Sequence, residues 1–225
     1  IPGFLADNNK FTDIVSPDIT MNSRVILNDL FVASLNRNVS FMNECEALSI
    51  SQSGSTVTVK TSCGTFLGKN VVICAPDFNS KVFDLPIKKS YAPIAVVENV
   101  PRDVPSFVEL DYFTKTCINL IKKPAGIAQA GGISVSTPKQ ADDYINYVIA
   151  EHKKRTPQIN VVGVYTGIKK ELVFPKQNRN YLYHCVKQSE NIWSVVLGKF
   201  TLGFSWAPEF FRQVYLRNPK KSHFI

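Results

Sequence analysis

Strand-like segments follow one another through the middle of the chain with no helical pattern between them, and this run constrains the fold most. Three apolar segments carry the pattern: 94–100, 106–113 and 117–123. Three prolines punctuate them: Pro101, Pro105 and Pro124. Short apolar runs bounded by proline predict antiparallel strands. The middle of the chain is therefore expected to form an antiparallel sheet.

A second group of strands precedes this middle region. Residues 56–59 alternate between threonine and valine, and a turn is expected at Ser53-Gly54. Residues 70–75 are almost continuously apolar, which is typical of a strand buried on both faces, and Pro76 is expected to end it.

Helices are predicted on both sides of the strands. Ser16 and Pro17 provide a cap and a first position for a helix over 17–36, and Thr137 and Pro138 do the same for 138–154. Further strands are expected near 159–165, 180–187 and 192–197, before a closing helix at 207–217. Helices around a strand-only middle predict an α/β layer joined to a mixed or antiparallel sheet, in a mixed α+β fold.

Basic residues are concentrated in the last third of the chain. The 225 residues carry a formal net charge of +8, and residues 151–225 contain 13 Lys and Arg against 4 Glu. A basic face interleaved with aromatic residues, which 177–184 could supply, is typical of nucleic-acid binding. A solvated surface, a phosphate-bearing ligand or an acidic protein partner fits the same charge. Charge alone leaves these interpretations open.

The cysteines and histidines indicate neither a disulfide framework nor a metal site. The five cysteines are spread singly, and their odd number favours a reducing compartment, either the cytoplasm or the mitochondrial matrix. The three histidines lie far apart in the sequence, so we expect no metal site. No run approaches 18 apolar residues, so we expect no membrane span.

The segment 194–211 places a glycine and a lysine between a strand and a helix. Gly198, Lys199, Phe200 and Thr201 follow the strand, and an apolar, helix-like stretch comes next. Glycine lets a ligand approach the backbone, and the first turn of a helix offers unpaired N–H groups to an electron-rich group. The pattern predicts either a ligand contact at 198–201 or a plain turn with a solvated lysine.

Three segments, taken in order, resemble the flavoprotein oxidoreductases of the D-amino-acid oxidase and FAD-dependent glycerol-3-phosphate dehydrogenase superfamily. The first runs from helix 17–36 through a hairpin to 71–76, where the family strand ends in Ala-Ala-Gly or a near variant. The second is helix 138–154 with the strand ending at 166–170, which is similar to the family's Gly-Leu-Arg-Pro segment. The third is 197–201, Leu-Gly-Lys-Phe-Thr, which is similar to Gly-Gly-Lys-Leu-Thr of the glycerol-phosphate dehydrogenases.

The resemblance implies FAD as the cofactor, with the turn 198–201 against the flavin pyrimidine. It also implies that Lys169, with Tyr165 nearby, binds the acid or phosphate group of a substrate. Lys169 stands where the family has an arginine, and lysine keeps the charge but lacks the planar fork. Phe204 stands at the second substrate-binding arginine. The implied reaction is hydride transfer from a substrate C–H bond to flavin N5, and no catalytic residue of the chain is assigned.

The nucleotide fingerprint of the family is missing from the sequence. No Gly-x-Gly-x-x-Gly occurs, and the glycines of 124–132 are too widely spaced to replace it, so we expect a substrate-domain loop there. The resemblance covers roughly 15–215, which corresponds to the later two-thirds of a full family member. Either the FAD-binding half lies elsewhere, or the fold has shed that half together with its cofactor.

Three regions and two main functions are therefore expected. Residues 1–85 would form part of the FAD layer, 86–175 a substrate-domain-like antiparallel sheet with one helix, and 176–225 strands and a helix returning to the FAD layer. The leading hypothesis is the substrate-binding, C-terminal portion of an FAD-dependent oxidoreductase that acts on a small acidic substrate together with the missing nucleotide-binding half. The alternative is a non-catalytic descendant, a structural or assembly subunit whose basic last third docks on an acidic partner or nucleic acid.

Overall fold

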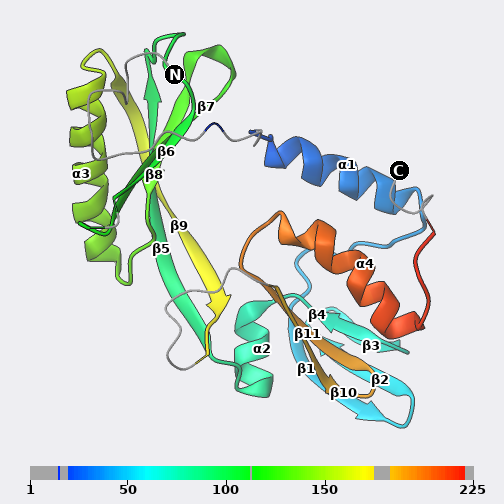
Figure 1. Cartoon of the computed structure of the whole chain (residues 1–225). Helices are drawn as coiled ribbons and strands as arrows, with labels where there is room; N and C mark the ends of the chain where they lie inside the picture. Colours follow the sequence, from blue (N-terminus) through cyan, green and yellow to red (C-terminus); the bar gives the residue numbers. More distant parts are fainter. Residues whose placement is uncertain (1–14, 16–19, 112, 175–182, 221–225) are drawn as a thin grey trace. The chain divides into compact units, whose positions relative to one another are not determined.

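The structure, a computed structural model of the chain, describes residue 15 and residues 20–111, 113–174 and 183–220 (Figure 1). Two compact units are present, each built from two separate stretches of sequence. The first combines the residues up to Ser40 with Ser90–Lys169, and the second combines Phe41–Lys89 with the residues from Lys170 onward. The helices and sheets confirm the predicted mixed α+β fold. The assignment of 1–85 and 176–225 to a nucleotide-binding layer stays a prediction.

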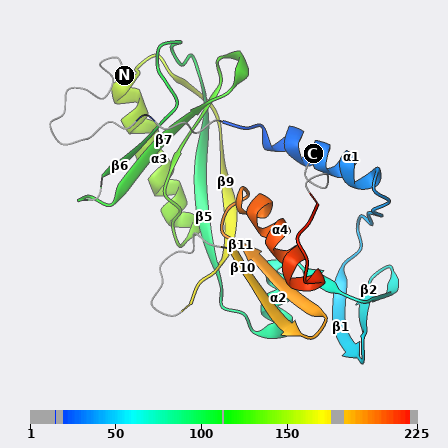
Figure 2. The ribbon, with the colours of Figure 1, turned by 45° about the vertical axis from the view of Figure 1, so that its right-hand side comes forward.

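The first unit is built on a five-stranded sheet in the order β6-β7-β8-β5-β9. Its strands are β5 (Ile87–Glu98), β6 (Phe107–Asp111), β7 (Thr116–Lys122), β8 (Ala128–Gly132) and β9 (Asn160–Leu172). The β6–β7, β7–β8 and β5–β8 pairs are antiparallel, as the proline-punctuated sequence predicts. The long strands β5 and β9 run side by side in both views (Figure 1, Figure 2).

One face of this sheet is covered by α3 (Pro138–Arg155), as Figure 1 shows. The predicted cap is present: the Thr137 hydroxyl accepts from the Gln140 N–H, and the Gln140 side chain accepts from the Thr137 N–H. Apolar residues of α3 pack onto alternate residues of the strands. The buried set includes Ala95, Val97, Ile118, Leu120, Ala128, Ala130, Ile145 and Val148. Residues between these positions on the strands point to the opposite face of the sheet.

Residues 124–132 do not form the predicted loop. Pro124–Gly126 is a 3-10 turn, and the residues after it form β8, a central strand hydrogen-bonded to both β7 and β5. Small residues are needed here because α3 approaches closely. A Cβ on Gly132 would lie 2.1 Å from the carbonyl oxygen of Cys117 and 2.4 Å from the hydroxyl of Tyr144. Gly131 and Gly132 therefore mark close packing within the sheet, whereas a Cβ on Gly126 would meet nothing within 4 Å.

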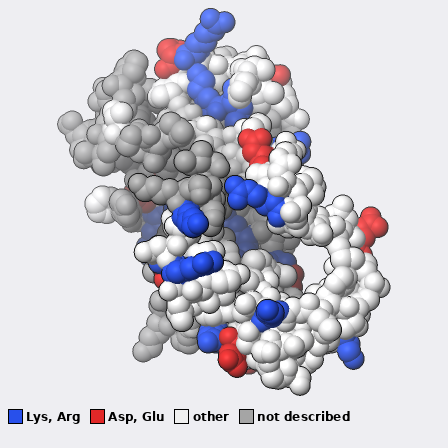
Figure 3. Space-filling model, turned by 90° about the vertical axis from the view of Figure 1, so that its right-hand side faces the viewer, with Lys and Arg blue, Asp and Glu red and all other residues white. Residues whose placement is uncertain are grey.

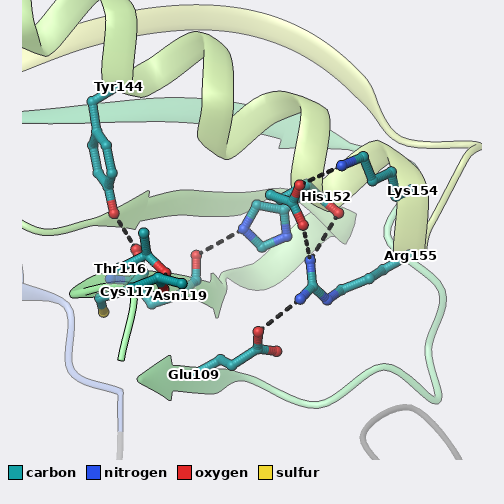
Figure 4. A network of polar contacts seen from close by, with 10 residues as sticks. Glu109, Thr116, Cys117, Asn119, Tyr144, His152, Lys154 and Arg155 are labelled. Carbon is teal, nitrogen blue, oxygen red and sulfur yellow. Dashed lines mark hydrogen bonds and ion pairs between the residues drawn. The ribbon is translucent and has the colours of Figure 1, made fainter. Parts of the chain in front are cut away.

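Polar side chains of α3 reach down to the backbone of β7 (Figure 4). The Tyr144 hydroxyl donates to the carbonyl of Cys117, and His152 Nε2 lies 3.2 Å from the carbonyl oxygen of Asn119. Because a carbonyl oxygen only accepts, Nε2 of His152 carries the proton. Burial raises the pKa of Tyr144 and lowers that of His152, so both side chains are held neutral.

The last turn of α3 is tied to β6 by charge (Figure 4). Arg155 donates to the Glu109 carboxylate at 2.7 Å and to the Glu151 carboxylate at 3.1 Å. Lys154 lies 2.6 Å from the other oxygen of Glu151, and hydrogen bonds from Lys154 and then Arg155 hold the pKa of Glu151 below its usual value. The positive charges in this last turn also interact favourably with the negative, C-terminal end of the helix dipole.

The buried histidine gives the fold a predictable response to acid. The pKa of His152 in the folded chain lies below the ordinary 6.5. As the pH falls, the imidazole is therefore protonated in the unfolded chain before it is protonated in the folded chain. The free energy of unfolding should therefore fall as the pH drops from about 7 to about 5. His152→Gln keeps an N–H donor for the Asn119 carbonyl and should remove part of that fall. Urea titrations of both proteins at the two pH values measure the fall in the free energy of unfolding. An unchanged pH dependence in the variant would contradict this role for His152.

The second unit contains two three-stranded sheets. The strands of the antiparallel sheet are β1 (Ala47–Ser53), β2 (Thr56–Thr61) and β3 (Gly64–Gly68). Those of the other sheet are β4 (Val71–Ile73), β10 (Tyr183–Ser189) and β11 (Ile192–Leu197). Its order is β10-β11-β4, with β4 parallel to β11. The predicted hairpin turn after Ser53 is present.

Strand β11 forms the interior of this sheet and is buried except at its last residue. The strand predicted over 70–75 is present as β4, but it lies at the edge of the sheet, and only Ile73 of its three residues is buried. Helix α2 (Pro76–Phe83), which the sequence did not predict, follows at once. The Asn79 side chain, itself fully buried, donates to the Ile73 carbonyl at 3.0 Å. Pro76 therefore starts a helix here, because the first helical position needs no N–H partner.

Helix α1 (Ser23–Leu35) is shorter than the predicted 17–36. Asn22 caps it, with its side-chain oxygen accepting from the Arg24 N–H at 3.1 Å, and the predicted cap at Ser16 and Pro17 lies outside the described residues. None of the residues of α1 is buried. Its large apolar side chains are 44–54% exposed: Val25, Leu27, Leu30, Phe31, Val32 and Leu35. Among the helices of the described residues, none has the length and apolar content needed to span a bilayer.

Candidate functional site

The turn 198–201 joins the buried strand β11 to α4 (Leu202–Tyr215), as the sequence predicts. The ring of Phe210 in α4 meets the ring of Trp193 in β11 edge-on, with 5.6 Å between centroids, and α4 runs along β10 and β11 (Figure 2). Lys199, Phe200 and Thr201 are exposed, and Gly198 is half-buried. The turn is thus an accessible segment held at both ends by packed elements.

Two backbone donors of this turn are available to a ligand. The N–H groups of Leu202, Gly203 and Phe204 donate to the carbonyls three residues earlier, at 3.1–3.3 Å. The N–H groups of Phe200 and Thr201 have no acceptor within the described parts of the chain. Since the first turn of α4 contains no acidic residue, the positive end of the helix dipole is not offset there. The turn can accept an anion or a polarised carbonyl.

The predicted substrate residues lie on β9, in the first unit. The side chain of Tyr165 is 45% exposed, and its hydroxyl accepts from Gln129 Nε2 at 2.9 Å. Lys169 is half-buried near the end of the strand. The structure therefore places both side chains on one strand of the antiparallel sheet, with a charge at Lys169 and an orienting hydrogen bond at Tyr165.

Gln129 is a candidate that the sequence interpretation missed. It belongs to β8, between the buried Ala128 and Ala130 that face α3, so its side chain points to the opposite face of the sheet. The same face presents Tyr165 through their hydrogen bond. The alternation of small apolar and polar residues in Ala128-Gln129-Ala130 is typical of a strand with Gln129 on the opposite face. The neighbouring glycines favoured a loop instead, so the pattern was not recognised.

Two further polar residues take structural roles. Lys170 pairs with Asp77 in the first turn of α2, and this hydrogen bond lowers the pKa of the Asp77 carboxyl. His184 lies edge-on to Phe174, with ring centroids 5.3 Å apart, and burial lowers the pKa of its imidazole. Of the two adjacent lysines in β9, Lys170 is therefore engaged by α2.

Comparison with solved structures identifies the fold as that of FAD-dependent amino acid oxidases. The chain is similar to NikD, an unusual amino acid oxidase essential for nikkomycin biosynthesis, with a TM-score of 0.62 and 13% identity over 80% of this chain and 53% of that one. Glycine oxidase from Geobacillus kaustophilus gives a TM-score of 0.63 at 13% identity, over 85% and 54% of the two chains. Iminodiacetate oxidase from Chelativorans sp. BNC1 gives 0.61 at 9% identity, over 88% and 56%.

The chain spans about half the length of these solved structures. No family model matches the sequence, and no curated protein matches it either. The fold expected from the resemblance is thus confirmed by shape, at a level of identity that leaves activity and substrate open.

Proposed function

We propose that the chain is the substrate-binding and C-terminal portion of an FAD-dependent oxidoreductase of the D-amino-acid oxidase or glycerol-3-phosphate dehydrogenase type. The observation that carries this proposal is the turn between β11 and α4. It is exposed, lies at a helix start without acidic residues, and holds two N–H groups, of Phe200 and Thr201, with no acceptor among the described residues. A fold match alone would not favour a ligand at this place.

The turn fits the flavin ring that the fold implies. Gly198 has no side chain to hold a flat ligand away from the backbone, and the two N–H groups suit a ring carbonyl that gains negative charge. Bound FAD would supply the redox chemistry. The residues of the turn, Gly198, Lys199, Phe200 and Thr201, would orient the ring and stabilise charge on its pyrimidine side.

The sheet of the first unit would then carry the substrate. Lys169 offers a positive charge to a carboxylate or phosphate, as a point charge without the fork of an arginine. Tyr165 and Gln129 form a hydrogen-bonded pair on the same sheet and could contact a polar group of the substrate. A small acidic molecule is the substrate class that these side chains favour.

Helix α1 favours a partner that supplies the rest of such an enzyme. Six large apolar side chains of this helix are about half exposed, which is costly for a helix that faces only water. Because the chain spans about half of the solved structures that it resembles, we infer that the nucleotide-binding half covers α1. Joined to the turn 198–201, that half would complete a site for FAD.

The second candidate is a non-catalytic descendant of the fold. It is favoured by Lys169 and Phe204, which stand where the family has substrate-binding arginines, and by the missing nucleotide fingerprint. Such a subunit would keep the sheet and helices but contribute no turnover, and its basic last third would dock on an acidic partner.

Among the described residues the charge distribution gives little support to a nucleic-acid function, and most of the stretch 177–184 lies outside these residues. Several basic side chains of the last third are paired with acids: Lys154 with Glu151, Arg155 with Glu109, Lys170 with Asp77, and Arg212 with Glu209. On the face drawn in Figure 3, Lys and Arg stand in small separate groups among uncharged residues. A continuous basic track for a phosphate backbone would be needed instead.

Flavin content separates the two main candidates. We expect the chain, purified after coexpression with the proposed nucleotide-binding half, to carry bound flavin and absorb in the blue region of the visible spectrum. Release of the flavin by denaturation gives its ratio to protein. Purified protein without flavin, even after flavin is added back, would contradict the enzyme proposal and favour the non-catalytic subunit.

A further inference from the structure

Two cysteines far apart in sequence meet at one end of the β1–β2–β3 sheet. Thr61 pairs with Gly64 across a two-residue turn, and Cys63 is the second residue of that turn. Beyond the Ala47–Thr61 pair, the Ser62 N–H donates to the Glu46 carbonyl at 2.9 Å. One step further out, Cys45 therefore stands opposite Cys63.

Both cysteines are held by the same side-chain atom. The Cys45 thiol donates to Thr61 Oγ1 at 3.2 Å, and the Cys63 backbone N–H donates to that oxygen at 3.1 Å. Thr61 in turn donates to the Gly64 carbonyl at 2.9 Å, so its hydroxyl is fixed in place. Cys63 Sγ lies 3.7 Å from the carbonyl oxygen of Glu44, the residue that directly precedes Cys45.

The two thiols are also arranged to react. The Cys63 side chain lowers the pKa of the Cys45 thiol, and the neighbouring Cys45 raises the pKa of Cys63. Thiolates are the reactive form of cysteine, so Cys45 is the nucleophile of the pair. Cys63 is exposed and Cys45 is half-buried, so small oxidants can reach both sulfurs.

We propose that Cys45 and Cys63 form a redox-reactive dithiol that closes to a disulfide in the presence of a peroxide. Residues opposite one another on antiparallel segments have Cα atoms about 4.5–5.5 Å apart, within the range of about 4.4–6.8 Å that a disulfide spans. The closed bond would tie the β2–β3 turn to the segment that leads into β1. In a reducing compartment the pair would rest as two thiols.

The reaction needs hydrogen peroxide as the oxidant. The Cys45 thiolate attacks one peroxide oxygen, the O–O bond breaks, and the departing hydroxide takes up a proton to leave as water, which gives a sulfenic acid on Cys45. The Cys63 sulfur then attacks the Cys45 sulfur, the S–O bond breaks, and a second water leaves with the Cys63 proton. In total, two thiols lose two electrons to one peroxide, which becomes two waters.

Trypsin mapping tests the pair directly. Cleavage after Arg37, Lys60 and Lys69 places Cys45 on peptide 38–60 and Cys63 on peptide 61–69. After one equivalent of peroxide, alkylation and digestion without reductant, we expect these two peptides to appear joined, lacking two hydrogens, and to separate again with dithiothreitol. Cys74→Ser, which removes another exposed cysteine, should leave the joined peptides unchanged.

The Cys63→Ser variant makes the test specific. It should abolish the joined peptides and let dimedone trap a sulfenic acid on Cys45, and the side chain is exposed in a turn, so the fold should tolerate the change. The proposal is overturned if peroxide leaves both wild-type peptides free for alkylation. It is equally overturned if Cys45 becomes joined mainly to a cysteine other than Cys63.

Discussion

Replacing Gly132 by alanine should lower the free energy of unfolding by about 3 kcal/mol or more. The new methyl carbon would lie 2.1 Å from the Cys117 carbonyl oxygen, which is backbone of the neighbouring strand β7 and cannot swing aside. It would also lie 2.4 Å from the Tyr144 hydroxyl, which donates to that same carbonyl. Relief requires α3 or β8 to move, and either movement opens the main core. Urea titration followed by circular dichroism measures the loss.

Gly163→Ala is the matched control for this substitution. Gly163 also lies in a strand of the same sheet, β9, but a Cβ there would meet nothing within 4 Å. Its unfolding midpoint should stay near that of the wild type or rise, because alanine lowers the entropy of the unfolded chain. Equal midpoints for the two variants would show that the close approach of α3 at Gly132 is not a constraint on the fold.

Elements whose ends are encoded by neighbouring residues could be predicted from the sequence. Helix 138–154 was predictable within one residue because its start is encoded locally, by Thr137, Pro138 and Gln140 in a capping box. The turn 198–201 was predictable for the same reason, since strand, glycine and helix follow directly along the chain. Local chemistry is enough to specify where such elements begin and end.

Strand β8 could not be predicted in this way. Glycine and alanine are poor strand formers, and in the sequence 124–132 they read as a loop. They form a central strand only because β7 and β5 flank them and α3 lies close above, and none of these contacts can be read from residues 124–132 themselves. The same limitation hid Gln129, whose orientation depends on which face of β8 meets the helix.

The boundaries between the units were beyond local patterns. The sequence predicted that 1–85 and 176–225 belong to one layer and 86–175 to a sheet of their own. In the structure the second unit combines Phe41–Lys89 with the residues from Lys170 onward, and the first combines Ser90–Lys169 with the residues up to Ser40. The chain passes between the units near Ser40, Lys89 and Lys169, inside or near elements whose sequences show no break. Strand β9 illustrates this, because it was expected to end at Tyr165 and continues to Leu172. Pairing with the long β5 sustains it through Gly167 and the two lysines.

Replacing Phe200 by proline should weaken flavin binding by the chain in complex with the proposed nucleotide-binding half roughly tenfold or more, because it removes one backbone donor from the turn. The Phe200 N–H has no acceptor within the described residues, so the change breaks no hydrogen bond of the protein itself. Phe200 is also the second residue of the turn 199–202, closed by the Leu202 N–H and the Lys199 carbonyl, where proline is well tolerated. Binding is measured by titrating the apoprotein with FAD and following flavin fluorescence.

Phe200→Ala separates the backbone donor from the aromatic ring. The ring of Phe200 meets that of Phe204 edge-on, with centroids 5.9 Å apart, and both variants lose this contact. Only the proline variant loses the N–H, so the difference in affinity between the two variants reports the donor alone. If both bind FAD equally well and unfold at the same urea concentration, the turn does not hold the flavin carbonyl. The stabilisation assigned to the start of α4 would then have to come from the nucleotide-binding half.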